Sequence, residues 1–145
     1  MEIRILQPGD EDVLRMVGPD VFDSPLDRPA TSEFLRDPRH HIVVAIDGGV
    51  VVGFASAVHY VHPDKPSPEL WINEVGVAST HRGGGLGTVI LQKLFDHART
   101  LGCVEAWVLT DRGNQGAMRL YGSRGGIETP TGQVMFTFRL DAGSS

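Results

Sequence analysis

The sequence predicts a single domain of the α/β (α+β) class, in which short strands alternate with helices. Its length of 145 residues is typical of one domain with one hydrophobic core. Runs rich in β-branched residues are separated by turn residues, and one such run is followed by a glycine cluster and a helical pattern. With 41% hydrophobic and 21% charged residues, the composition is that of a globular protein rather than a disordered or fibrous one.

The strongest local pattern is an antiparallel hairpin. Two β-rich runs, 41–46 and 50–61, flank Asp47-Gly48-Gly49, and glycines supply the positive φ angles that a tight hairpin turn requires. Further strands are expected at 2–6, 70–77 and 104–109, with a closing strand at 134–140.

The longest helix is expected directly after the glycine cluster. Apolar residues recur at helical spacing from Val89 to Ala98, which is typical of a helix with one buried face. The helix is predicted to end at Gly102, because glycine commonly terminates helices. Shorter helices are expected after an Asp10 N-cap, at 31–35 and at 114–121.

Segment 18–38 is broken by prolines and rich in acidic residues. We interpret it as a loop and helix that face the substrate. The domain is expected to span 1–141, followed by a disordered tail at 142–145.

Net charge and cysteine content argue against several classes of function. A net charge of −5 disfavours nucleic-acid binding, which needs a basic face, and favours a cationic small molecule. No stretch approaches the ~18 apolar residues of a membrane span, and the N-terminus lacks the features of a signal peptide. The single cysteine, Cys103, excludes an intrachain disulfide. We therefore expect a cytoplasmic protein, and exposed strand edges favour a homodimer.

The glycine cluster at 83–87 predicts a phosphate site. Backbone N–H groups at a helix start are unpaired and carry the positive end of the helix dipole, so a glycine loop that opens onto a helix binds anions. Two common phosphate motifs do not fit. A Walker loop needs a lysine that this cluster lacks, and a dinucleotide fingerprint belongs at the first strand rather than in mid-chain. By themselves, the glycines are equally compatible with a simple flexible loop.

Two separate motifs resemble the GNAT N-acetyltransferase superfamily. The hallmark of that family, Arg/Gln-x-x-Gly-x-Gly/Ala, is met by Arg82, Gly85 and Gly87. Its second segment, Asn-x-x-Ala-x-x-Leu-Tyr-x-x-x-Gly, is met by 114–121 together with Gly125. The departures from the family are glycines in place of its usual basic residue, glutamine and aromatic residue, at Gly83, Gly84 and Gly126.

The resemblance implies a fold and a co-substrate. Members of the family have a mixed, mostly antiparallel sheet that is splayed near its middle, with helices on both faces, and acetyl-CoA enters the splay. The loop amides wrap the CoA pyrophosphate, and the preceding strand holds the pantetheine arm like an added strand. The residues expected to contact acetyl-CoA are Val75, Gly76, Val77, Arg82, Gly83, Gly84, Gly85, Leu86, Gly87, Thr88 and Asn114.

The same resemblance assigns catalytic roles to two residues. Acetyl transfer from a thioester to an amine needs a neutral amine, a polarised carbonyl and a stabilised leaving thiolate. Glu74 corresponds to the general base, and Tyr121 corresponds to the phenol that protonates the sulfur. From the residues alone, Glu74 could also be a solvent-facing strand residue, and Tyr121 could pack a helix. His59 and His62 lack metal-site spacing, so no metal is expected.

At closer range, 51–53, 60–68 and 69–77 resemble type I aminoglycoside 3-N-acetyltransferases. This resemblance implies a small-molecule amine substrate, the 3-amino group of an aminoglycoside, and a role in antibiotic resistance. An acidic cleft suits such a polycation. Alternatives that stay open are another small amine or a peptide as acceptor, and a CoA-binding module without turnover. The acids expected to line the acceptor cleft are Asp111, Glu128, Asp23 and Glu33.

Overall fold

The computed structural model describes residues 1–128 and 132–141, and the predicted tail at 142–145 lies outside them. Five strands form one sheet in the order β1-β2-β3-β4-β5. The first three pairings are antiparallel and the β4–β5 pairing is parallel, which confirms a mixed, mostly antiparallel sheet. The strands are β1 (Glu2–Ile5), β2 (His40–Asp47), β3 (Val50–Tyr60), β4 (Glu69–Val77) and β5 (Glu105–Val108).

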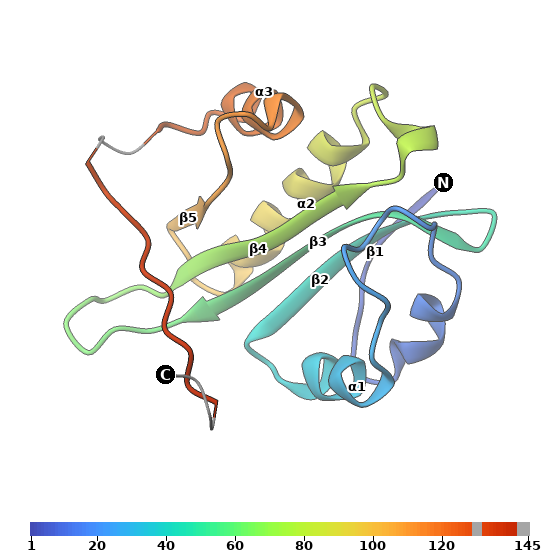
Figure 1. Ribbon diagram of the computed structural model, residues 1–145. Helices are drawn as coiled ribbons and strands as arrows, with labels where there is room; N and C mark the ends of the chain where they lie inside the picture. The colour runs from blue at the N-terminus through green and yellow to red at the C-terminus, as the bar shows by residue number, and fades with distance from the viewer. Residues whose placement is uncertain (129–131, 142–145) are drawn as a thin grey trace.

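Helices cover both faces of the sheet, as predicted. Helix α2 (Leu86–Thr100) lies behind the sheet in Figure 1 and contacts β2, β3 and β4. On the other face, the 3₁₀ helix η1 (Asp10–Arg15) contacts β3, and α1 (Arg28–Arg36) contacts β2. The short 3₁₀ helix η2 (Ser79–His81) follows β4, and α3 (Gln115–Ser123) follows β5. None of the helices within the described ranges is long and apolar enough to cross a membrane.

The hydrophobic core lies mainly between the sheet and α2. Ile90, Leu91 and Leu94 on α2 are fully buried, as is Val43 on β2, and each such side chain contributes roughly 1.5–3 kcal/mol by leaving water. Gly53 lets the helix approach β3 closely, because a Cβ there would lie 2.9 Å from Cδ1 of Ile90.

The structure confirms two predictions that rest on glycine. Gly48 and Gly49 form the β2–β3 turn with φ angles of 57° and 80°, as a tight hairpin requires. Helix α2 ends before Gly102, which has a φ of 90°. The N–H of Cys103 then donates to the carbonyl oxygen of Ala98 at 3.1 Å, which is the Schellman arrangement.

The first predicted helix differs from the expectation in type and in its cap. Asp10–Arg15 is a 3₁₀ helix, and its N-cap is Gly9, with a φ of 96°. The carboxylate of Asp10 instead accepts from the backbone N–H of Gln7 at 2.7 Å. The chain then leaves the helix so that Val17 forms a bridge with Val51 of β3. This tertiary pairing ends the helix early, because it requires extended backbone.

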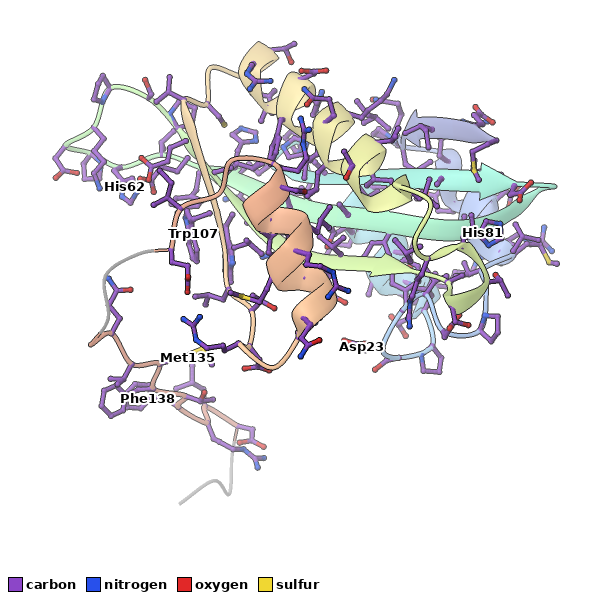
Figure 2. The ribbon with its side chains drawn as sticks, turned by 90° about the horizontal axis from the view of Figure 1, so that it is seen from above. Asp23, His62, His81, Trp107, Met135 and Phe138 are labelled. Carbon is purple, nitrogen blue, oxygen red and sulfur yellow. The ribbon has the colours of Figure 1, made fainter. Side chains whose placement is uncertain are left out.

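The predicted closing strand at 134–140 is wrong. These residues form no ladder with the sheet, and their apolar side chains are exposed, with Phe138 79% and Leu140 93% accessible. Figure 2 shows Met135 and Phe138 on a segment that is part of neither the sheet nor a helix. Strand propensity largely reflects packing against a neighbouring strand, and this segment has none. Within the described ranges, β5 is therefore an edge strand.

A chain of three histidines lies between the sheet and α2, with His41 buried and His59 and His97 half-buried. Nε2 of His41 lies 2.7 Å from Nδ1 of His59, and Nδ1 of His41 lies 3.3 Å from Nε2 of His97. Only 7% of His41 is accessible. Burial first, and then the neighbouring His97 and His59, lower the pKa of His41 to about 4. The ring is therefore neutral in the folded protein at neutral pH.

This histidine predicts a loss of stability in acid. The pKa of His41 is about 4 when folded and about 6.5 when unfolded, so the unfolded chain binds more protons across that window and stability falls as the pH drops through it. We expect the melting temperature, measured by circular dichroism, to fall less between pH 7 and pH 4.5 for a His41→Gln variant than for the wild type. Equal slopes for the two proteins would contradict this expectation.

Candidate active site

The sheet opens between β4 and β5. The two strands pair from Glu69 with Glu105 to Ile72 with Val108, whereas β4 continues to Val77 and runs on past β5 in Figure 1. In the part of the chain that the structure describes, the end of β4 has no strand partner on this side. A cleft of about 1510 Å³ occupies the opening, bounded by β4, the glycine loop and α3. The predicted splay is confirmed, and within the described ranges it lies between β4 and the edge strand β5.

A β-bulge at Asn73 marks the point where the strands separate. On β3, Ala57 pairs with Ile72 and the adjacent Ser56 pairs with Glu74, so Asn73 is an additional residue in β4. A bulge bends its strand and increases the local twist. The twist carries the remainder of β4 away from β5.

The sequence contains a signal for this bulge. Apolar residues alternate at Leu70 and Ile72, and alternation resumes out of phase at Val75 and Val77. Because side chains of a strand alternate between its faces, the shift in phase requires an extra residue between the two halves. Asn73 is that residue.

Glu74 projects from the face of the sheet that lies opposite α2. It pairs with Ser56, two residues from Phe54, and alternation places both on that face. Its side chain is exposed and lines the cleft. A carboxylate in this position is accessible to an acceptor that enters from the open face.

Tyr121 lies on α3 and lines the same cleft. Its side chain is half-buried, and burial raises the pKa of the phenol, so it is protonated at neutral pH. The helix ends in a Schellman motif, in which the N–H of Gly126 donates to the Tyr121 carbonyl oxygen at 2.9 Å. A Cβ at position 126 would lie 2.7 Å from that oxygen. Gly126, where the family usually has an aromatic residue, therefore fits this tight helix end.

The glycine loop presents the N-terminus of α2 to the cleft. Gly83 and Gly85 have φ angles of 81° and 82°, which disfavour other residues. Gly85 is the N-cap of α2, and the first N–H groups of a helix have no partner within it. A Cβ at positions 83, 84 or 85 would meet no atom within 4 Å. The glycines at 83 and 85 thus allow the left-handed backbone conformation of the loop, and the space in front of the helix N-terminus is open.

Arg82 and His81 fasten this loop to the rest of the protein. Nε of Arg82 donates to the carbonyl oxygen of Val77 at 2.9 Å, where the chain leaves β4. Nε2 of His81 lies 2.8 Å from the carboxylate of Asp47, and its Nδ1 lies 2.7 Å from the hydroxyl of Thr80. These contacts fix the position of the loop relative to the strand.

The loop at 18–23 forms another wall of the cleft. The carboxylate of Asp20 accepts from the backbone N–H of Ser79 at 2.9 Å, and hydrogen bonding from Ser79 lowers the pKa of Asp20. The ring of Phe22 stacks on Phe54 of β3 at 3.9 Å. The structure therefore confirms that the loop half of segment 18–38 faces the cleft, whereas α1 contributes no lining residue.

Most of the predicted site residues are brought together. Three are not: Gly84 and Glu33 do not line the cleft, and Glu128 pairs instead with Arg112 at 2.5 Å. Asn114 lines the cleft, but its side-chain oxygen already caps α3 by accepting from the N–H of Ala117 at 3.1 Å. The predicted residues that line the cleft are Asp23, Glu74, Val75, Gly76, Val77, Arg82, Gly83, Gly85, Leu86, Gly87, Thr88, Asp111, Asn114 and Tyr121.

The sequence analysis missed several lining residues. Asn73 was detectable from the shift in apolar phase along β4. Asp20 and Arg119 carry no local signal, because their places depend on how 18–23 and α3 pack against the sheet. With Asp20 included, the cleft is lined by the acidic side chains of Asp20, Asp23, Glu74 and Asp111.

The fold, the splayed strand and the glycine loop define an acyltransferase of the acetyl-CoA-dependent class. The chain belongs to the acetyltransferase (GNAT) family, whose family model matches residues 11–125. It is 33% identical to the N-alpha-acetyltransferase RimI of Mycobacterium tuberculosis over 131 residues, 85% of this chain and 80% of that protein. It is 30% identical to N-acetyltransferase 8 of Rattus norvegicus over 95 residues, 66% of this chain and 43% of that longer protein.

Solved structures share the fold at lower identity. One is an aminoglycoside acetyltransferase from an uncultured soil metagenomic sample in complex with sisomicin, with a TM-score of 0.77, 18% identity and coverage of 97% of this chain and 96% of that one. Another is AAC(6')-Iy in complex with the bisubstrate analog CoA-S-monomethyl-acetylneamine, with a TM-score of 0.77, 21% identity and coverage of 97% and 98%. The protein is an N-acetyltransferase, and the family uses acetyl-CoA.

One prediction concerns Gly76, where the 18–23 loop meets β4. A Cβ at Gly76 would lie 2.3 Å from the carbonyl oxygen of Val21 and 2.8 Å from Cε1 of Phe54. Because the nearest atom belongs to the backbone, we expect Gly76→Ala to destabilise the protein by about 2 kcal/mol and to lower its melting temperature by several degrees.

The matched control for this variant is Gly113→Ala, since a Cβ there meets no atom within 4 Å. Scanning calorimetry of both variants checks the expectation. A melting temperature for Gly76→Ala equal to that of the control would show that the loop does not press on β4.

Proposed function

We propose that the protein transfers the acetyl group of acetyl-CoA to the 3-amino group of an aminoglycoside. The observation that carries this proposal is that Glu74 and Tyr121 line one acidic cleft, whose walls are an unpaired strand edge and a glycine loop at a helix start. The family supplies the reaction, and the cleft supplies the groups that the reaction needs.

The cleft suits acetyl-CoA at both of its walls. Pyrophosphate oxygens would accept from the unpaired N–H groups at the start of α2, where the helix dipole also favours negative charge. The amides of the pantetheine arm would pair with the free edge of 75–77, as a strand adds to a sheet. Asn114 would contribute its side-chain NH₂, since its oxygen caps α3.

Glu74 and Tyr121 provide the two proton transfers. The carboxylate of Glu74 accepts a proton from the acceptor ammonium, and the neutral nitrogen forms a bond to the thioester carbonyl carbon. The carbon–sulfur bond then breaks, and Tyr121 donates its phenolic proton to the departing sulfur. The nitrogen of the adduct releases its surplus proton to the tyrosinate, which restores Tyr121 and leaves a neutral amide. The raised pKa of Tyr121 supports this role, because the phenol carries its proton when the thiolate forms. The products are an amide and free CoA.

The acidic lining supports a polycationic acceptor. Asp20, Asp23 and Asp111 lie around the same cleft as Glu74, and together these acids outnumber the arginines of the lining, Arg82 and Arg119. A lining with an excess of negative charge concentrates cationic ligands. The protein as a whole carries a net charge of −5. Two proteins of the same fold bind sisomicin and a neamine conjugate.

A second candidate acceptor is the N-terminal amine of a peptide. The observation in its favour is the 33% identity to an N-alpha-acetyltransferase over 85% of this chain. Both acceptors are primary amines, so the same catalytic residues would serve either of them.

A thiol-release assay with acetyl-CoA distinguishes the acceptors and tests Glu74. We expect wild-type turnover with sisomicin and not with short peptides. We expect Glu74→Gln to lower kcat at least about 10²-fold at pH 7, with partial recovery at high pH, where more of the amine is already neutral. Tyr121→Phe should lower kcat without changing the affinity for CoA.

Glu33→Gln is the matched control, because Glu33 is exposed on α1 outside the cleft, and it should keep the wild-type rate. Turnover with peptides alone would transfer the proposal to the second candidate. Wild-type kcat in Glu74→Gln would remove Glu74 as the base.

The glycine loop yields a prediction that involves two neighbouring positions. Gly85 has a φ of 82°, and an alanine there costs roughly 1–2 kcal/mol, so the loop of Gly85→Ala should leave its present shape and bind CoA up to about tenfold more weakly. Gly84 has no positive φ, so Gly84→Ala should retain the wild-type affinity. Isothermal titration with CoA measures both. Equal losses of CoA affinity in the two variants would show that the loop needs glycines to leave space for the ligand rather than to adopt its backbone conformation.

A further inference from the structure

Two tryptophans form a flat aromatic surface on the open face of the sheet. Trp71 of β4 and Trp107 of β5 are register partners, and their rings stack at 5.0 Å between centroids with 6° between their planes. Trp71 is 38% accessible, which is unusual for so large an apolar side chain. Neither residue has a role in the chemistry proposed above.

Hydrogen bonds hold the orientation of Trp107, and Trp71 stacks on it. Nε1 of Trp107 donates to the hydroxyl of Tyr60 at 2.6 Å, and that hydroxyl donates to the carboxylate of Glu69 at 2.9 Å. His62 approaches the same carboxylate at 3.0 Å. A ring fixed in this way loses little conformational entropy when a ligand binds, which is the advantage of a preorganised surface.

The bulge at Asn73 places this surface directly beside Glu74. Trp71 pairs with Val58, and Glu74 pairs with Ser56. Val58 and Ser56 are two residues apart on β3, so they share a face and are separated by about 6.7 Å. Trp71 and Glu74 therefore neighbour each other on the open face, although three positions separate them in the sequence. An acceptor whose amine reaches Glu74 must extend past Trp71 if it continues along the sheet in this direction.

Acidic groups border the tryptophan pair on the side away from Glu74. Glu69 and Glu105 are register partners, and alternation places them on the same face as Trp71 and Trp107. Hydrogen bonds from His62 and Tyr60 lower the pKa of Glu69, which keeps it anionic at neutral pH. Flat aromatic rings bordered by carboxylates attract ligands that combine apolar ring faces with ammonium groups.

We infer that Trp71 and Trp107, bordered by Glu69, form an acceptor subsite that binds a second ring of a polycationic amino sugar while the reacting ring lies at Glu74. This inference rests on the proposed function and extends it to acceptors of more than one ring. The C–H face of the second ring lies on the indole of Trp71, and its ammonium groups lie toward Glu69.

The test compares acceptors with one ring and with several rings. Sisomicin is the larger acceptor and 2-deoxystreptamine is the single-ring acceptor. We expect Trp71→Ala to raise KM for sisomicin about tenfold, with kcat changed less than twofold, and to leave the kinetics for 2-deoxystreptamine unchanged. Trp71→Phe, which keeps an aromatic face, should restore most of the affinity. Val61→Ala, at an exposed apolar position on the same end of the sheet, is the control.

A binding measurement separates failure of this subsite from failure of the proposed function. Sisomicin should quench the tryptophan fluorescence of Glu74→Gln in a saturable manner, and Trp71→Ala should abolish that quenching, whether or not the wild type turns sisomicin over. Saturable quenching without turnover would keep the subsite and remove the proposed reaction. Two results would overturn the subsite. One is the absence of quenching. The other is an equal loss of kcat/KM for both acceptors in Trp71→Ala that Trp71→Phe does not restore.

Discussion

The additional residue in β4 is the constraint on which the rest of the site depends. Pairing with β5 stops at Ile72, one residue before the bulge at Asn73, and a bulge increases strand twist at its position. Strand β5 also ends at this level, at Val108, so β4 has no ladder on this side beyond Ile72 within the described ranges. The unpaired edge of β4 thus begins where β5 ends and β4 has its bulge.

Close backbone approach shapes the cleft from two sides. At Gly76, the 18–23 loop presses its backbone onto β4, and at Gly53, α2 comes close to β3 from the opposite face. A third close contact is at Gly87, where a Cβ would lie 3.1 Å from Leu120 on α3. These contacts set the distances between the strand, the loop and the two helices.

The sequence predicted those parts of the fold that depend on local chemistry. Gly48 and Gly49 identify the hairpin turn, and Gly102 identifies the end of α2, because each needs a backbone conformation that favours glycine. The closing strand expected at 134–140 is absent, since a strand-like sequence shows capacity for strand pairing but not the presence of a partner. Glu33 and Glu128 failed as cleft residues for a similar reason. Their placement depends on how α1 and the segment after α3 pack, which charge pattern alone does not encode.

The bulge also bears on how this site can change during evolution. The β3 partners of Ile72 and Glu74 are consecutive residues, and Asn73 has no partner between them. Deletion of Asn73 would therefore leave every other side chain of β4 on its present face. The core under α2 and the carboxylate of Glu74 would both survive such a deletion. The twist that parts β4 from β5 would not. Deletion of a single codon would therefore change the twist of β4 while the core kept its side chains, so sequence similarity along this strand is a poor measure of its twist.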